Sequence, residues 1–423
     1  MTIEKRGKTD VVIVGAGVIG ICTAYYLSRS NRDVIVLDKG EVCSGCSYGN
    51  AGLIVPSHCI PLAEPGVITK GMKWILNPES PFYIKPRLDK DLLDWLWRFR
   101  SACNETHVKR SMPVIRDLTF ESLDLYKEII GNDVSNFGFE QRGSLFLCNT
   151  KKAMDELVEK MGQLQSVGIE AEILNQVQTQ EKVGKLKVSV VGSVYYPQDG
   201  HIQPARFVKK LAEKAIESGV KIQSNTEVLG FEKKGNRLTK VRTIRGDIKT
   251  DEVVIASGAW SPAITRQLGV YLKIQPGKGY SITFERPEVS ANLPLMLVEM
   301  KTGVTPMGDT TRIAGTLELA GFDFAINEKR VQGILKSVPQ YLPDFDPKYC
   351  RVIDVWRGMR PCTPDGLPYL GRPESYENLT VAAGHAMIGI SLGPVTGRIA
   401  SRIVLRKDPE FNLNPLRLDR FNC

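Results

Sequence analysis

Residues 11–20 read Val-Val-Ile-Val-Gly-Ala-Gly-Val-Ile-Gly, in which four β-branched residues precede three glycines spaced Gly-x-Gly-x-x-Gly. The β-branched run predicts a buried parallel strand, and residues 21–30 predict a helix directly after the last glycine. Residues 34–37 form a second apolar run, which ends at Asp38. The stretch therefore predicts a strand–helix–strand unit with a glycine-rich turn, the opening unit of a doubly wound α/β domain.

The parts of this unit suit a dinucleotide. Gly15 permits the tight turn, Gly17 lets the backbone approach a pyrophosphate, and Gly20 lets the helix pack closely on the strand. The N-terminus of that helix, which follows Val18 and Gly20, presents free N–H groups and the positive end of its dipole to the phosphates. Asp38 can accept hydrogen bonds from ribose hydroxyls, and its charge argues against NADP.

The same apolar run, residues 11–27, follows Lys5, Arg6 and Lys8 and superficially resembles a signal peptide or membrane anchor. It lies at the short end for a spanning helix, and its glycine spacing is better explained by the phosphate-binding turn. We therefore expect a strand–turn–helix here and not an anchor.

The composition is that of an ordinary globular chain. Of 423 residues, 42% are hydrophobic and 24% are charged, which suits two or three domains. The net charge of +9 is spread over short basic clusters, which favours an anionic substrate or lipid surface over nucleic acid. Nine cysteines and four histidines lack metal-ligand spacing, so we expect free thiols, a reducing compartment and no metal, with Cys43 and Cys46 as the only CxxC pair.

The loop at residues 43–54 distinguishes flavin from nicotinamide. An ordinary NAD domain would continue with a helix and a strand, whereas this loop is small, polar and glycine-rich. It resembles the segment under the flavin in the D-amino-acid oxidase superfamily of FAD-dependent oxidoreductases. The resemblance implies non-covalent FAD, held here by Lys39, Ser47, Asn50, Ala51, Gly52 and Leu53.

The chain is most similar to the D-amino-acid dehydrogenase branch of that superfamily, and the resemblance extends along its whole length. The matching features are Ala-Glu-Pro-Gly at 63–66, Lys-Trp at 73–74, Ser-Pro-Phe at 80–82 and Trp-Leu-Trp-Arg-Phe at 95–99. The resemblance implies further FAD contacts at Val228, at the turn of Ser257, Gly258 and Trp260, and at Gly389, Ile390, Ser391 and Leu392 where the last helix opens. The dipole of that helix would help the flavin accept negative charge.

Residues 357–368 resemble the superfamily signature Gly-x-Arg-Pro-x-Thr-x-Asp-Gly-x-Pro. The resemblance implies that Arg360 binds the substrate carboxylate, a task for which a guanidinium offers two parallel bonds. The alternative is a structural arginine paired with Asp365. The chain departs from the glycine-oxidase pattern at Ala386, Met387 and Ile388, where those oxidases carry a second arginine.

Three further residues are candidate catalytic groups beside Arg360. Tyr280 closes a Pro-x-Lys-Gly-Tyr element that resembles the family, although a structural strand tyrosine fits equally. Glu318 lies in a segment similar to a family strand beside the substrate, and His58 follows the flavin loop.

The fold class is α/β, with a discontinuous Rossmann-like FAD-binding domain and an α+β substrate domain with a mainly antiparallel sheet. We assign residues 1–85, 195–265 and 350–423 to the FAD-binding domain and residues 86–194 and 266–349 to the substrate-binding domain.

The resemblance implies oxidation of a C–H bond next to an amine. In the family, hydride moves from the substrate Cα to flavin N5, and water hydrolyses the imine that forms. This implies an FAD-dependent D-amino-acid dehydrogenase that acts on a small neutral or proline-like substrate and passes electrons to a quinone or dye-type acceptor. Two alternatives stay open: an oxygen-using amine oxidase of the glycine or sarcosine oxidase type, and the flavin subunit of a larger dehydrogenase with a second subunit.

Residues 91–99 carry closely spaced apolar side chains, which with Trp74, Ile75 and Phe82 could form a membrane-contacting patch. A buried helix is the alternative, and we favour it. We expect a cytoplasmic protein. If the apolar patch is exposed, we expect the protein to bind peripherally to the inner face of the cell membrane.

Overall fold

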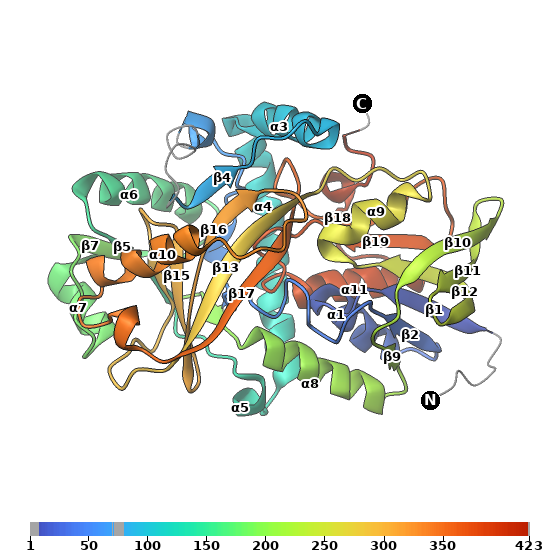
Figure 1. The fold of residues 1–423 in the computed structure, drawn as a ribbon, viewed down its shortest axis with the longest axis horizontal. Helices are drawn as coiled ribbons and strands as arrows, with labels where there is room; N and C mark the ends of the chain where they lie inside the picture. The colour runs from blue at the N-terminus through green and yellow to red at the C-terminus, as the bar shows by residue number, and fades with distance from the viewer. Residues whose placement is uncertain (1–7, 70, 72–79, 422–423) are drawn as a thin grey trace.

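Two β-sheets lie side by side along the long axis of the molecule (Figure 1). The computed structural model describes residues 8–69, 71 and 80–421. The long helix α4 (Glu105–Ile130) runs across the middle of the molecule between the two sheets. The predicted combination of a Rossmann-like sheet with a mainly antiparallel sheet is confirmed.

The smaller sheet has a parallel part with the order β19-β12-β1-β2-β9. Its strands are β1 (Thr9–Val14), β2 (Val34–Leu37), β9 (Lys221–Gln223), β12 (Gly246–Ile255) and β19 (Leu379–Ala383). Strand β2 is buried at every position, which explains its uninterrupted apolar sequence. Antiparallel neighbours extend this sheet: β18 (Tyr369–Gly371), β10 (Val228–Lys234) and β11 (Arg237–Thr243).

Helix α1 (Val18–Ser28) lies against the smaller sheet and packs on α8 (Pro204–Glu217) and α11 (Gly393–Val404). Each residue from Val18 to Leu27 is buried, so the helix is apolar on all sides. A Cβ on Gly397 would lie 2.5 Å from the backbone carbon of Cys22. The glycine is therefore what allows α1 and α11 to cross so closely.

The larger sheet has the order β17-β13-β16-β15-β14-β5-β7-β6, with β4 beside β16. Its pairings are antiparallel except β14 with β5 and β16 with β4. The strands are β4 (Phe82–Ile84), β5 (Ser144–Cys148), β6 (Glu172–Asn175), β7 (Gly192–Tyr196), β13 (Gln275–Glu285), β14 (Leu295–Leu297), β15 (Thr302–Met307), β16 (Thr310–Leu319) and β17 (Val352–Cys362).

The remaining elements connect and cover these sheets. Helix α10 (Glu328–Ser337) packs on β16, and the short pair β3 (Leu53–Ile54) and β8 (Gly200–His201) carries the chain out of the flavin loop. The other helices are α3 (Lys90–Ala102), α5 (Val134–Phe137), α6 (Lys151–Gln165), α7 (Gln176–Val183) and α9 (Ser261–Arg266). Single 3₁₀ turns lie at Pro56–His58, Gly258–Trp260, Val338–Gln340, Pro347–Tyr349 and Asn414–Leu416.

Sheet membership differs from the predicted domain ranges in three strands. Strands β4, β7 and β17 lie in the larger sheet, although residues 82–84, 195–196 and 352–362 fall in ranges assigned to the FAD-binding domain. Strand β17 pairs with β13 along almost its entire length, a contact between distant segments that no local pattern reveals. The division into domains itself stays a prediction.

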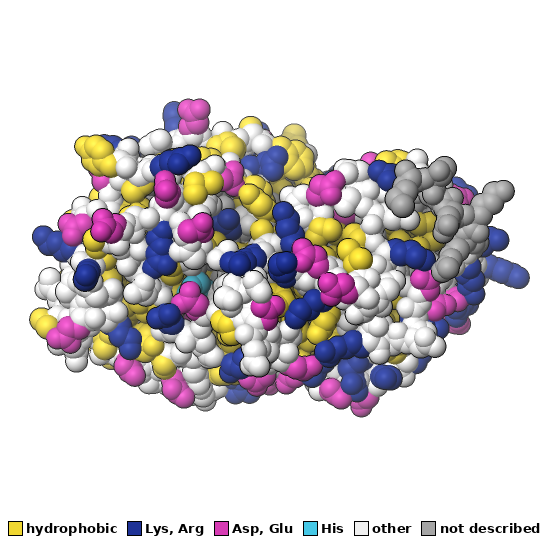
Figure 2. All heavy atoms as spheres, turned by 90° about the horizontal axis from the view of Figure 1, so that it is seen from below, with side chains coloured by type: hydrophobic (Ala, Val, Ile, Leu, Met, Phe, Trp, Pro, Cys, Tyr) yellow, Lys and Arg dark blue, Asp and Glu magenta, His cyan; other side chains and the backbone are white. Residues whose placement is uncertain are grey.

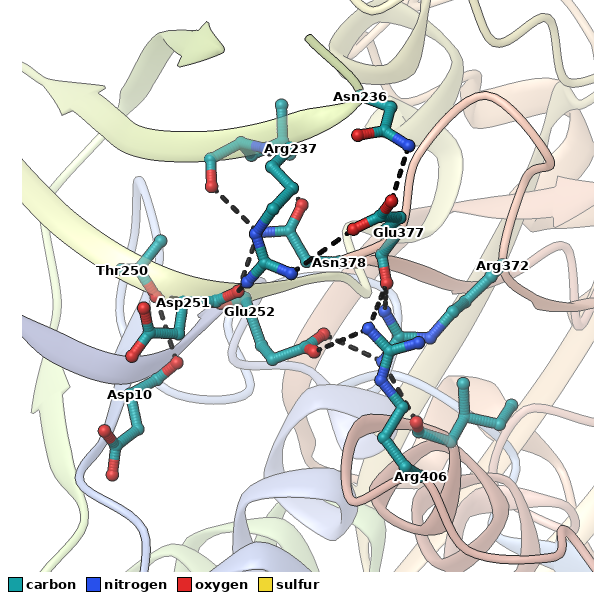
Figure 3. Close-up of polar contacts among 12 residues, drawn as sticks. Asp10, Asn236, Arg237, Thr250, Asp251, Glu252, Arg372, Glu377, Asn378 and Arg406 are labelled. Atoms are coloured by element: carbon teal, nitrogen blue, oxygen red, sulfur yellow. Dashed lines mark hydrogen bonds and ion pairs between the residues drawn. The ribbon is translucent and has the colours of Figure 1, made fainter. Parts of the chain in front are cut away.

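A polar network closes the end of the smaller sheet away from the glycine-rich turn (Figure 3). Glu252 on β12 lies 2.8 Å from Arg372 and 3.6 Å from Arg406. Both arginines donate to the backbone carbonyl of Glu377, and the Asn378 amide donates to the backbone of β11 and β12. The network thus ties the β10–β11 hairpin, β12 and the segment after α11 together.

The surface carries charges of both signs. On the face seen in Figure 2, Lys and Arg side chains are interspersed with Asp and Glu. Within the part of the chain that the structure describes, no helix combines the length and apolar character needed to cross a membrane, and no group of three potential ligands could hold a metal ion.

Candidate active site

The glycine-rich turn lies where β1 meets α1, as the spacing predicts. Gly15 has a φ of +114°, and a Cβ there would lie 2.5 Å from the carbonyl oxygen of Ala256. A Cβ on Gly20 would lie 1.8 Å from the carbonyl oxygen of Gly15. Gly17 is the N-cap of α1, whose first turn holds no acidic residue. The helix terminus is thus shaped and charged to receive phosphate groups.

Asp38 has a contact that the sequence did not show. Its carboxylate accepts hydrogen bonds from the backbone N–H groups of Ala16, at 2.6 Å, and Gly40, at 2.8 Å. The carboxylate therefore braces the glycine-rich turn from the end of β2, and its contact with a ribose stays a prediction.

The flavin loop, residues 43–54, lies against the start of α1. The Ser47 hydroxyl accepts a hydrogen bond from the backbone N–H of Val18 at 3.0 Å. Asn50 folds the loop back on itself, since its Oδ1 accepts from Gly52 N at 2.8 Å. Gly52 itself has a φ of +73°. The loop and the glycine-rich turn, separate motifs in the sequence, thus form one surface, on which Ala51 and Leu53 also lie.

Arg312 on β16 is a site residue that the sequence did not single out. Its Nη1 donates to the carbonyl oxygens of Tyr48 and Asn50, each at 2.9 Å, and its Nε donates to Thr283 at 3.1 Å. The side chain is buried, and burial lowers the pKa of the guanidinium. A charged residue inside an apolar strand was the available signal. Arg312 fixes the flavin loop to the larger sheet.

The start of the last helix also meets the flavin loop. The Ser391 hydroxyl donates to the carbonyl oxygen of Leu53 at 2.8 Å, and the Tyr126 hydroxyl of α4 donates to Ile390 at 2.7 Å. Gly389 and Leu392 lie in the same turn, just before α11. The predicted residues 389–392 are therefore brought to the loop.

The turn after β12 completes this surface. Ser257 donates to the carbonyl oxygen of Val14 at 2.9 Å, and Gly258 has a φ of +54°. The ammonium of Lys39 lies 4.1 Å from the centre of the Trp260 ring, which joins the turn to the end of β2. Val228 opens β10 nearby in the same sheet. These positions fit a dinucleotide that extends from the glycine-rich turn to the larger sheet.

Arg360 lies on β17, and its guanidinium is held by a bulge in β16. It donates to the carbonyl oxygens of Thr316 and Gly315, and Thr316 has a φ of +66°. No carboxylate of the described residues forms an ion pair with Arg360. Burial lowers the pKa of its guanidinium. Arg360 is therefore a desolvated cation that has no carboxylate partner among the described residues.

The alternative role for Arg360, a structural partner of Asp365, is wrong. Asp365 pairs with Arg420 instead, through two bonds of 2.7 and 3.0 Å. Only the tertiary structure reveals this pair, because Arg420 lies close to the carboxyl terminus. Asp365 is therefore not the partner of Arg360, whose guanidinium contacts backbone carbonyls instead.

Tyr280 and Glu318 lie on the other face of the larger sheet. The Tyr280 hydroxyl donates to Glu318 at 2.8 Å, and both are buried with Lys278 and Arg330. Side chains alternate along β13, so Tyr280 faces α10 while its neighbours Gly279 and Ser281 face the other way. The structure therefore does not bring these two candidates to Arg360, and their buried ion cluster packs the far side of the sheet.

His58 lies in the 3₁₀ turn after the flavin loop. Its ring centre lies 5.3 Å from that of Phe146, and burial lowers its pKa to about 4, so the imidazole is neutral at pH 7. No hydrogen bond or ion pair joins it to Arg360 within the described part of the chain. Its turn packs against α4 and its ring against β5, where the neutral imidazole supplies no charge.

Asp199 is a buried carboxylate behind the flavin loop. It accepts hydrogen bonds from the N–H and hydroxyl of Ser57, at 3.1 and 2.6 Å, and from the hydroxyl of Ser144 at 2.5 Å. Burial raises its pKa to about 6. The group anchors the end of the loop to β5, and the sequence offered only the Asp-Gly turn as a signal.

Comparison with known proteins agrees with this geometry. The chain matches the FAD dependent oxidoreductase family, DAO, over residues 10–403. A D-amino acid dehydrogenase of Granulibacter bethesdensis is 31% identical over 417 residues, which cover 97% of this chain and 99% of that protein. A D-amino acid dehydrogenase of Vibrio atlanticus is 30% identical, with 97% of this chain and 100% of that protein covered.

Solved structures share the fold. Glycine oxidase from Geobacillus kaustophilus has a TM-score of 0.80 at 24% identity and covers 98% of this chain and 99% of its own. L-proline dehydrogenase from P. horikoshii has a TM-score of 0.76 at 20% identity, with 98% of each chain covered. The family match spans nearly the whole chain, and the protein therefore belongs to the DAO family of FAD-dependent oxidoreductases.

Proposed function

We propose that the protein is a D-amino-acid dehydrogenase in which Arg360 binds the substrate carboxylate. The observation that carries this proposal is the Arg360 guanidinium, half-buried on β17 and without an ion pair among the described residues. The relatives of 30–31% identity support the substrate class, because they are named D-amino acid dehydrogenases. The substrate is a small neutral or proline-like amino acid.

FAD, when bound, supplies the two-electron oxidation. The chain holds it with the glycine-rich turn, the flavin loop and the start of α11, and it orients the substrate with Arg360. The planar guanidinium donates two parallel bonds to a carboxylate, which fixes the plane of the carboxylate and the position of the Cα attached to it. Orientation and exclusion of water are the chain's main contributions.

The test is anaerobic reduction of the bound flavin by a matched panel of D- and L-amino acids. We expect D-alanine and D-proline to bleach the visible flavin band and their L-enantiomers to leave it unchanged. Bleaching by the L-acids alone would refute the D-specific assignment.

An oxygen-using amine oxidase is the second candidate, and the fold shared with glycine oxidase favours considering it. The two activities differ in the electron acceptor. A dehydrogenase reduces a quinone or a dye and produces little hydrogen peroxide in air. Peroxide formed in proportion to the substrate oxidised would select the oxidase instead.

For the acceptor, we propose a quinone reached at a membrane surface through α3. The fold buries part of the predicted membrane-contacting patch, because Leu92 and Trp95 are 2% exposed and belong to the core. Leu93 and Trp97, 58% and 67% exposed, lie on the outer side of the helix, beside the fully exposed Leu88. Trp74 and Ile75 lie outside the described residues. Cosedimentation with anionic vesicles should fall when Leu93 and Trp97 are both replaced by serine, and unchanged sedimentation would refute the contact.

A further inference from the structure

Gly277, Gly279 and Gly358 leave room for neighbouring side chains on the face of the larger sheet on which Arg360 lies. Gly277 faces Arg360 across the β13–β17 ladder, and Gly279 faces Gly358. Cross-strand partners point to the same side of a sheet, so Arg360, Gly279, Gly358 and Trp356 share one face. The backbone of Gly279 and Gly358 forms a floor on this face, and the Arg360 guanidinium and the Trp356 ring cover it, while Leu317 and Cys362 fill the space over Gly277.

The Arg360 guanidinium lies flat on that floor. A Cβ on Gly279 would lie 2.1 to 2.3 Å from three guanidinium atoms of Arg360. Any other residue at position 279 would therefore move the guanidinium. The position of the proposed carboxylate ligand is set by a glycine on the neighbouring strand.

The indole of Trp356 lies on the same floor, next to the guanidinium. A Cβ on Gly358 would lie 1.8 Å from Trp356 Cη2, and a Cβ on Gly49 would lie 1.9 Å from Trp356 Cε3. The six-membered ring is thus wedged between β17 and the flavin loop. Gly279 and Gly358 are cross-strand partners, and the Cβ positions of such partners are about 5 Å apart. The guanidinium over Gly279 and the ring over Gly358 are therefore immediate neighbours.

The indole nitrogen of Trp356 lies at the other end of the ring system. Trp356 is half-buried, and its Nε1 has no hydrogen-bond partner among the described residues. Trp95, by contrast, is buried and donates its Nε1 to the carbonyl oxygen of Cys362 at 2.9 Å. A buried tryptophan usually finds such a partner, whereas the half-buried Trp356 can donate its Nε1 to solvent or to a ligand. Trp356 instead presents a flat apolar surface and a free donor beside a cation that has no anion.

We propose that Trp356 is the side-chain wall of the substrate site and limits the size of the amino acid that Arg360 can hold. The inference rests on the proposed function, because it takes Arg360 as the carboxylate ligand. A carboxylate bound to the guanidinium places the substrate Cα and its side chain next to the indole, which adjoins the guanidinium on the same face of the sheet. The wall favours small side chains by excluding larger ones.

The experiment compares kcat/KM for D-alanine and D-phenylalanine in the wild-type holoenzyme and in Trp356→Ala, Trp356→Phe and Tyr349→Ala. Tyr349 is 89% exposed at the surface, so its variant is the matched aromatic control. We expect the ratio of D-phenylalanine to D-alanine to rise about tenfold or more in Trp356→Ala, less in Trp356→Phe, and to stay unchanged in Tyr349→Ala. Propionate and phenylpropionate bind without turnover. The ratio of their affinities for the oxidised protein should change among the variants in the same order as the kcat/KM ratio.

The outcomes separate the inference from the function on which it rests. If the ratio and the inhibitor affinities are unchanged in both Trp356 variants, or if all substrates weaken equally, Trp356 is a packing residue and the inference fails. If Trp356→Ala loses FAD, the same criteria are applied to Trp356→Phe, which keeps an aromatic ring between β17 and the flavin loop. A wild-type flavin that no amino acid reduces would refute the proposed function itself.

Discussion

At the scale of single residues, the decisive observation is that the Arg360 guanidinium has no carboxylate partner among the described residues. Arg360 is desolvated, bound to two backbone carbonyls and free of ion pairs within the described chain, while Asp365, the expected partner, is satisfied by Arg420. A cation in this state interacts strongly with an anion that displaces water from it.

Replacing Arg360 by methionine should abolish the carboxylate contact and leave the flavin in place. Loss of one partner of a partly buried charge pair costs about 2–5 kcal/mol, so kcat/KM should fall about 30-fold or more. Arg360→Lys should recover part of the loss, because a lysine keeps the charge without the fork. The measurement is steady-state kinetics with flavin content as the control, and wild-type kinetics in Arg360→Met would contradict the assignment.

Two glycines should respond differently to alanine. In Gly279→Ala the new Cβ meets the end of a flexible side chain, so Arg360 moves, KM rises and FAD stays bound. In Gly15→Ala the Cβ meets the backbone of Ala256 at a φ of +114°, so the turn distorts and FAD is lost. Flavin absorbance after gel filtration distinguishes them, and equal FAD retention in both would contradict the reading of the turn.

At the scale of elements, buried polar groups hold the pieces of the two sheets in place. The Asp199 carboxylate links the end of the flavin loop to β5, and the Glu252 network links β12 to the segments around it. Both make predictions about stability that do not depend on catalysis.

Asp199 should make stability depend on pH between about 4 and 6. Burial raises its pKa to about 6 in the folded chain, so the folded state holds a proton that the unfolded chain has already released in this range. The stabilisation is complete below about pH 4 and is lost as the pH rises through about 6, by at most about 3 kcal/mol. His58, His201 and His385, whose pKa values burial lowers, contribute the opposite slope to both proteins. In urea unfolding, the stability of the wild type relative to Asp199→Asn should therefore fall across this range, and parallel profiles would contradict it.

Removing Glu252 should destabilise the smaller sheet. Its carboxylate is 13% exposed and meets Arg372, so Glu252→Ala leaves two arginines facing each other and should lower the free energy of unfolding by about 3 kcal/mol. Glu128→Ala is the control, since the Arg29–Glu128 pair is 54% exposed on each side and should change stability by less than about 1 kcal/mol. Stability is measured by thermal and urea unfolding. Equal losses of stability in Glu252→Ala and Glu128→Ala would contradict the role of the network.

At the scale of the whole molecule, the cofactor surface is assembled from both sheets. The glycine-rich turn belongs to the smaller sheet, whereas Arg312 and Trp356, which hold the flavin loop, belong to the larger one. FAD should therefore stabilise the two sheets as one unit.

We expect FAD to be released by acid precipitation and to raise the Tm of the apoprotein in a single transition. Free FAD at 100 times its Kd adds about 2.7 kcal/mol of stability. The measurement is calorimetry of apo and reconstituted protein, with the yellow colour of the acid supernatant as the check on non-covalent binding. Flavin that stays in the pellet would contradict it.

The sequence alone determined the phosphate-binding turn, the order of the first strands and the flavin loop. These features are local: the glycine spacing of residues 15–20 and the buried runs of β1 and β2 each arise from a backbone requirement within a few residues. The role expected for Arg360 came from a motif of the same local kind.

The tertiary structure alone decided which side chains share the site. Tyr280 and Glu318 lie on the far face because strand alternation and the bulge at Thr316 set their direction, and neither can be read without the strand pairing. Arg312 on the flavin loop, Arg420 on Asp365 and Trp356 beside Arg360 are contacts between distant segments. Such contacts are set by packing of the folded chain, which local periodicity does not contain.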